Sequence, residues 1–115
     1  MKATVQDRLQ HMLEAIDAIE DLAGLNRPYT RVERAAFERF FEIVSEASRH
    51  LPEDLRAEHP HIPWRAIANL GNALRHGYES IDLERLAKIA RRDMTELRMA
   101  ALAMLARLQS PERQP

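Results

Sequence analysis

The segment IPWRAIANLGNALRHGY, residues 62–78, decides how the chain is expected to fold. Pro63 suits the first turn of an α-helix, because no N–H donor is needed there and proline holds φ near its helical value. Ile67, Leu70 and Leu74 follow at spacings of three and four residues. This periodicity predicts an amphipathic helix whose apolar face packs against a core.

Polar side chains gather near the end of the same segment. Asn72 and His76 are four residues apart, so a helix places them on one face, and Arg75 and Tyr78 are neighbours at a spacing of three. A cation, an imidazole and a phenol thus lie within about one helical turn. Because histidine ordinarily titrates near neutral pH, this group is a candidate for acid–base chemistry.

The N-terminal part of the chain predicts two further helices. Thr4 with Asp7 is a helix start signal, and Gly24, which tolerates positive φ, is expected to cap the end of that helix. Thr30 with Glu33 forms a capping box for a second helix. This helix should be central to the core because it carries all the phenylalanines, Phe37, Phe40 and Phe41.

Prolines and an aspartate divide the rest of the chain. Pro52 should end the second helix, and residues 53–58 can form a short helix before Pro60. Asp82 is predicted to cap a last long helix, and residues 110–115 to form a disordered tail. The apolar positions of the last helix step by three and four: Leu83, Leu86, Ala90, Met94, Leu97, Ala101, Met104 and Leu108.

These elements predict an all-α fold, an antiparallel bundle of four to five helices, with residues 1–115 forming a single domain. The net charge of −1 supplies no basic field, so contact with RNA would need a local patch. The chain has no cysteine and no run of the roughly 20 apolar residues that a membrane span needs. We therefore expect a cytoplasmic protein with no membrane contact.

The segment also resembles the HepT-like branch of the HEPN superfamily, which forms the toxin half of HEPN–MNT toxin–antitoxin pairs. The residues that match in order and spacing are Ile62, Pro63, Trp64, Arg65, Ile67, Asn72, His76, Tyr78 and Asp82. One position departs from the pattern: Gly71 stands where the family has its arginine, five residues before His76.

The resemblance implies a HEPN-type bundle that forms a homodimer, with the Asn72–Tyr78 segments near the twofold axis. It also implies a metal-independent endoribonuclease that acts on RNA without a cofactor, in which His76 is the general base or acid. A cognate MNT-type nucleotidyltransferase antitoxin would neutralise this toxin. In the HepT-like branch the nucleotidyltransferase adds AMP to the tyrosine two residues after the histidine, here Tyr78.

Each candidate residue has a second interpretation. His76 can instead be a histidine that caps a helix end. Arg75 either replaces the missing catalytic cation or is a solvated surface arginine; its direction differs from that of Gly71 by about 40° around the helix. Asn72 either orients His76 or is a local structural amide. Tyr78 can be a packing aromatic with its hydroxyl in water.

Gly71 itself needs an explanation, because an interior glycine costs roughly 1 kcal/mol of helix stability relative to alanine. Close approach of a partner's backbone across the twofold axis is one explanation, and drift after loss of the arginine is the other. Glu46, which matches a family glutamate, is expected to hold Arg75 or another cation of the site. The remaining histidines do not have the spacing of a metal site; they are His11, His50, His59 and His61.

Three functions therefore remain open from the sequence. The first is a HepT-like ribonuclease toxin that uses His76, Arg75 and Asn72. The second is a binding module that partners a nucleotidyltransferase but cleaves weakly or not at all, because Gly71 has replaced the arginine. The third is a structural dimerisation domain, which leaves the polar residues of the segment unexplained.

Overall fold

The structure is a computed structural model that describes residues 3–76 and 83–109. Within these ranges it contains five helices and no strand, which confirms the predicted all-α fold class. In chain order the helices are α1 (Val5–Ala23), α2 (Arg31–Arg49), α3 (Glu53–Ala57), α4 (Trp64–Arg75) and α5 (Leu83–Gln109).

Both long N-terminal helices begin at the predicted caps. The Thr4 hydroxyl accepts from the Asp7 N–H at 3.0 Å, and the Asp7 carboxylate accepts from the Thr4 N–H at 3.0 Å. Thr30 and Glu33 form the same reciprocal pair at the start of α2. Each pair satisfies two backbone donors that the first helical turn leaves without partners.

The end of α1 is capped by Gly24, as predicted. Its φ is −80°, so the cap does not use the left-handed conformation that glycine tolerates. Its N–H donates to the carbonyl of Glu20 at 3.1 Å, which continues the helical pattern by one residue. A residue with a side chain could adopt this backbone conformation.

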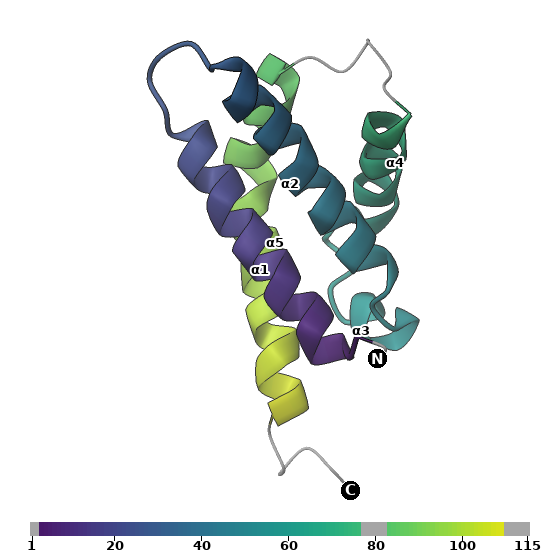
Figure 1. Ribbon diagram of the computed structural model, residues 1–115. Helices are drawn as coiled ribbons and strands as arrows, with labels where there is room; N and C mark the ends of the chain where they lie inside the picture. The colour runs from purple at the N-terminus through teal and green to yellow at the C-terminus, as the bar shows by residue number, and fades with distance from the viewer. Residues whose placement is uncertain (1–2, 77–82, 110–115) are drawn as a thin grey trace, which may run out of the picture.

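α2 is the central element of the bundle. It lies between α1 and α4, while α1 also packs against α5 (Figure 1). Phe37 and Phe41 are buried on α2 and Phe40 is partly buried, as the clustering of aromatic residues predicted. Burial of such side chains is the main source of stability in a bundle of this size.

Trp64 fixes the point at which α4 begins. Its indole N–H donates to the backbone carbonyls of Arg56 and His59, both at 3.1 Å. Ile62 is buried beside it, and Pro63 occupies the N-cap, one residue before the first turn where we expected it. α3 and the loop after it therefore set how α4 runs along α2.

α5 packs against α1 through the predicted apolar stripe. The buried members of this stripe are Met94, Leu97, Ala101 and Met104. Leu108, its last member, is 39% exposed. The predicted cap at Asp82 and the predicted tail at 110–115 lie outside the described residues. In the described part of the chain, no helix is both long and apolar enough to cross a membrane.

Candidate active site

Polar side chains from α2 and α4 meet along the line where these two helices pack. We call this group the α2–α4 cluster, and it consists of Glu46, Arg49, His50, Asn72 and Arg75. Arg49 and His50, the C-cap of α2, lie three and four residues after Glu46, so each is a neighbour of Glu46 on that helix. The α4 members, Asn72 and Arg75, are also three residues apart and share one face of α4. The packing of α2 against α4 brings these two faces together.

Asn72 is the junction of the cluster. Its side-chain oxygen accepts a hydrogen bond from Nη1 of Arg49 at 3.0 Å and another from Nη2 of Arg75. The two arginines come from different helices and converge on one neutral amide oxygen. The side-chain oxygen of Asn72 is therefore bound by two cations.

Glu46 is the acidic member of the cluster. One of its carboxylate oxygens lies 3.0 Å from Nε2 of His50, and the other lies 3.7 Å from Nη1 of Arg75. The hydrogen bond with His50 lowers the pKa of Glu46, and the positive charges of Arg49 and Arg75 lower it further. An ionised Glu46 near Arg75 agrees with the expectation that this glutamate holds a cation of the site.

The positive charge of Arg49 is less compensated by carboxylates than that of Arg75. Among the residues that the structure describes, its hydrogen-bond partner is Asn72, and no carboxylate lies within ion-pair distance of it. The two guanidinium groups and one carboxylate of the cluster give it two positive charges and one negative charge. It is thus a local basic patch on a chain whose net charge is −1.

Gly71 lies directly beside the cluster, and it is buried against α2. A Cβ atom at this position would overlap both Oγ and Cβ of Ser45. The Ser45 hydroxyl in turn donates to the carbonyl of Ala68 at 3.3 Å. The glycine therefore allows a close approach by α2 of the same chain, not by the backbone of a partner subunit as one of our explanations proposed.

A small cavity of about 160 Å³ opens at this contact. Its lining comes from α2 and α4 and consists of Arg39, Glu42, Ser45, Glu46, Gly71 and Arg75. Arg39 and Glu42 form an ion pair of 3.6 Å with each other. The wall of the cavity thus contains Gly71, at the position where the family pattern has its arginine, and Arg75.

His76 and Arg75 lie at the end of α4. Arg75 is the last residue of the helix, and His76 is its exposed C-cap, with its backbone N–H donating to the Asn72 carbonyl at 3.1 Å. The helix thus ends before Gly77, and the structure brings Asn72 and Arg75 together as expected. Tyr78, the predicted site of modification, lies outside the described residues.

The other histidines lie apart from any metal-like arrangement in the described ranges, where no group of three or more His, Cys, Asp or Glu residues could hold an ion. His50 is bound to Glu46, and the rings of His59 and His61 are 6.1 Å apart. His50 therefore belongs to the α2–α4 cluster, a role that its position in the sequence did not suggest.

Arg49 is the member of the cluster that sequence reasoning missed. It follows Glu46 by three residues, so the sequence does show these two charged residues as neighbours on one face of α2. That signal alone does not indicate which other helix the face meets. Only the pairing of α2 with α4 shows that Arg49 reaches Asn72.

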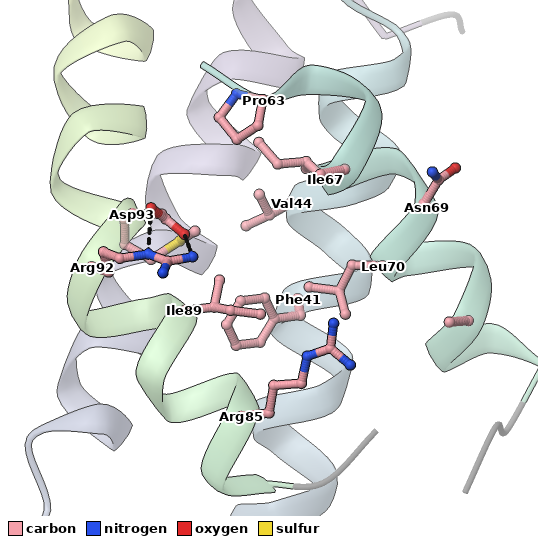
Figure 2. A pocket seen from close by; sticks show the side chains of 13 residues that line it. Phe41, Val44, Pro63, Ile67, Asn69, Leu70, Arg85, Ile89, Arg92 and Asp93 are labelled. Carbon is pink, nitrogen blue, oxygen red and sulfur yellow. Dashed lines mark hydrogen bonds and ion pairs between the residues drawn. The ribbon is translucent and has the colours of Figure 1, made fainter. Parts of the chain in front are cut away.

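A larger cavity of about 580 Å³ lies between α2, α4 and α5 (Figure 2). Its wall is mostly apolar: Phe41, Leu70 and Ile89 face one another across it, while Asn69 points away. Arg92 and Asp93, hydrogen-bonded at 3.3 Å, lie at its α5 side. Because its wall offers few polar groups, we do not assign the candidate chemistry to this cavity.

The fold is an all-α bundle of the HEPN type. The α2–α4 cluster gives it a basic site next to the end of α4, where His76 lies. The "Ribonuclease HepT-like" family model matches residues 12–104, which is most of the chain. The chain belongs to the HepT-like ribonuclease family.

Curated relatives agree with this assignment. The chain is 32% identical over 102 residues to "Probable ribonuclease HepT" of Thermococcus cleftensis, covering 85% of this chain and 93% of the relative. It is also 32% identical over 98 residues to a "Putative RNase" of Methanocaldococcus jannaschii, covering 85% and 90% of the two chains. No solved structure matches the chain significantly.

Proposed function

We propose that this protein is a metal-independent endoribonuclease in which His76 performs the proton transfer. Membership of the HepT-like ribonuclease family supports an RNase. The observation that carries the proposal is the convergence of Arg49 and Arg75 on Asn72, on the helix that ends at His76. This arrangement puts cations, which can hold a phosphate, next to a group that can move a proton.

The reaction follows from the chemistry of these groups. His76 takes the proton from a ribose 2′-hydroxyl, and the 2′-oxygen forms a bond to the adjacent phosphorus. The bond from phosphorus to the 5′-oxygen breaks, and a proton is delivered to that leaving oxygen. The products are a 2′,3′-cyclic phosphate and a 5′-hydroxyl end. Arginine stabilises the negative charge that builds up on the phosphate oxygens.

The same proposal includes a toxin role and a homodimer. A cognate MNT-type nucleotidyltransferase antitoxin would add AMP to Tyr78, which places bulk and negative charge beside His76 and blocks access of a phosphate. Support for a homodimer comes from apolar side chains that α2 and α5 expose: Val32 is 77% exposed, Met99 is 64% and Leu102 is 50%. Met99 and Leu102 are three residues apart on α5 and so are neighbours on one face, where exposed apolar side chains often mark a contact surface.

A second candidate is a binding module that partners the nucleotidyltransferase and does not cleave efficiently. The contact between Gly71 and Ser45 favours it, because position 71 cannot accept the arginine of the family pattern without moving α2. Both candidates use the same fold and the same basic cluster. They differ in whether bound RNA is cut.

Cleavage of a panel of RNAs by the purified protein separates the two. We expect cleavage by the native chain with and without EDTA, because the proposed chemistry uses only an imidazole and guanidinium groups. His76→Ala should abolish it with the helical circular dichroism spectrum intact, whereas His61→Ala, a change of an exposed histidine in the loop before α4, should not. Cleavage that persists in His76→Ala, or that EDTA removes and Mg²⁺ restores, contradicts the proposed enzyme. An inert native chain that still binds RNA favours the binding module.

A further inference from the structure

We propose that Arg49 and Arg75, held together by Asn72, form the phosphate-binding site of this chain, so that a residue of α2 takes over the task of the missing motif arginine. The inference rests on the proposed function, because it names how the same site holds an RNA phosphodiester. It assigns a binding role to Arg49 and a positioning role to Asn72.

The first argument is the convergence of like charges. Two guanidinium groups that share one neutral oxygen repel each other, so the arrangement is favourable only if something compensates the repulsion. Each guanidinium has five N–H donors, and the Asn72 oxygen takes one from each. The remaining donors can bind a phosphate, whose oxygens match the planar fork of arginine.

Other arginines of the chain show a different arrangement. Arg27 binds Glu33 through two hydrogen bonds of 2.8 and 2.7 Å, so its charge is matched by one carboxylate. Arg98 of α5 binds both Asp17 and Glu20 of α1. These arginines form ion pairs that connect elements of the fold. Arg49 and Arg75 instead meet at an uncharged group, with one carboxylate, Glu46, 3.7 Å from Arg75, so two positive charges share one negative charge.

Glu46 limits the excess charge without removing it. Its carboxylate lies 3.7 Å from Arg75 and is already hydrogen-bonded to His50 at 3.0 Å. Glu46 therefore orients Arg75 from the α2 side, while Asn72 holds it from the α4 side. Arg49 keeps a full positive charge beside them, so the site still attracts a phosphate.

The position of the pair also fits the proposed reaction. Gly71 cannot carry a side chain because of Ser45, and Arg75 is a neighbour of the small cavity beside that contact. Arg75 immediately precedes His76, and Asn72 shares a helix face with it. A phosphate held by the pair thus lies at the end of α4 that carries the imidazole.

RNA that cannot be cleaved gives a test of binding alone. We would measure the affinity of the native protein for a fluorescent 2′-O-methyl RNA oligonucleotide by anisotropy at several salt concentrations. Arg49→Ala and Arg75→Ala should each weaken binding by about tenfold, since each removes charge-assisted hydrogen bonds. Each should also lower the slope of log affinity against log salt by about 0.7, as expected for one lost phosphate contact on a single strand.

Three further variants test whether the loss of binding comes from the loss of charge, from the arginine geometry or from the fold. Arg92→Ala, which removes an exposed arginine of α5, is the matched control and should bind like the native chain. Arg49→Lys should recover only part of the affinity, because an ammonium keeps the charge but lacks the planar fork. Asn72→Ala should weaken binding, and in its background Arg49→Ala should cost less than in the native chain.

The outcomes are distinct for this inference and for the proposed enzyme. Arg49→Ala and Arg75→Ala that bind like Arg92→Ala, or a native chain that does not bind the oligonucleotide, would overturn the phosphate site. His76→Ala should bind the oligonucleotide normally while failing to cleave ordinary RNA. If His76→Ala still cleaves while Arg49→Ala does not bind, the phosphate site stands and the assigned role of His76 is wrong.

Discussion

Gly71 of α4 and Ser45 of α2 pack so closely that position 71 has no room for a side chain. The contact brings the two helices together at the place where Arg49, Asn72 and Arg75 meet. It also explains why a glycine is retained in a helix interior, where alanine would otherwise be preferred. The absence of the family arginine is thus coupled to the packing of α2 on α4.

The first prediction concerns the stability of this contact. Gly71→Ala gains about 1 kcal/mol of helix propensity but overpacks the interface, which typically costs about 1–3 kcal/mol. The overlap involves the Cβ of Ser45, which cannot swing away, so we expect a net loss of about 1–2 kcal/mol in the free energy of unfolding. Urea denaturation measures it. Gly71→Arg should lose more, and should not raise RNA cleavage.

A double-mutant cycle provides the control. Ser45→Gly removes both atoms that a new Cβ would meet, so Gly71→Ala should cost much less in that background. Equal costs of Gly71→Ala in the two backgrounds would show that Ser45 does not set the requirement for glycine.

A second prediction concerns the anchor of α4. Trp64→Phe keeps an aromatic ring but removes the N–H that donates to the carbonyls of Arg56 and His59. We expect a loss of about 1 kcal/mol in the free energy of unfolding, since the two bonds share one donor and water can reach a half-buried site. Thermal denaturation followed by circular dichroism would detect it. A variant as stable as the native chain would mean that these bonds contribute nothing net.

The parts of this fold that follow from the sequence are those in which the interacting residues are close together in the chain. Thr4 with Asp7, and Thr30 with Glu33, are each three residues apart, and both capping boxes form as predicted. The phenylalanines of α2 could be assigned to the core because their spacing marks one helix face. Gly24 caps α1 as predicted, but in a right-handed conformation, since glycine permits left-handed φ without requiring it.

The candidate site could be predicted only in part for the same reason. Asn72 and Arg75 lie on one helix, so their proximity follows from the helical period. The contacts of Arg49 with Asn72, and of Gly71 with Ser45, depend on how two helices pair, which no local pattern encodes. Resemblance to a family indicated Glu46 but not Arg49, because the pattern has its cation at position 71.

A third prediction uses the pH dependence of stability. The guanidinium of Arg27 and the Thr30 N–H bind the carboxylate of Glu33 and lower its pKa from 4.5 to about 2. Because the folded pKa lies below the unfolded one, this stabilisation is complete above about pH 4.5 and is lost as the pH falls toward 2. Glu33→Gln should therefore flatten the decline of the melting temperature in that window.

The exposure of this site makes the expected effect small, and a matched control is needed. Glu14→Gln removes an exposed carboxylate of α1 that is not part of a capping box. It should leave the decline of the melting temperature at acid pH as in the native chain. If the melting temperatures of both variants fall alike between pH 2 and 5, the cap at Glu33 is not the source of that decline.

The last prediction tests whether the subunits of the proposed homodimer exchange groups between their sites, or each chain supplies both His76 and Arg75 to its own site. Light scattering should first give the mass of a dimer at micromolar concentration. His76→Ala and Arg75→Ala subunits, of which the first should be inactive alone and the second weakened, are then refolded together. If each site takes its histidine from one subunit and its arginine from the other, the mixture should recover about a quarter of the native rate, because half of the dimers are mixed and each of these has one complete site. The separate variants at the same total concentration are the controls. A monomeric native protein, or a mixture no more active than its components, would mean that each chain must supply both groups to its own site.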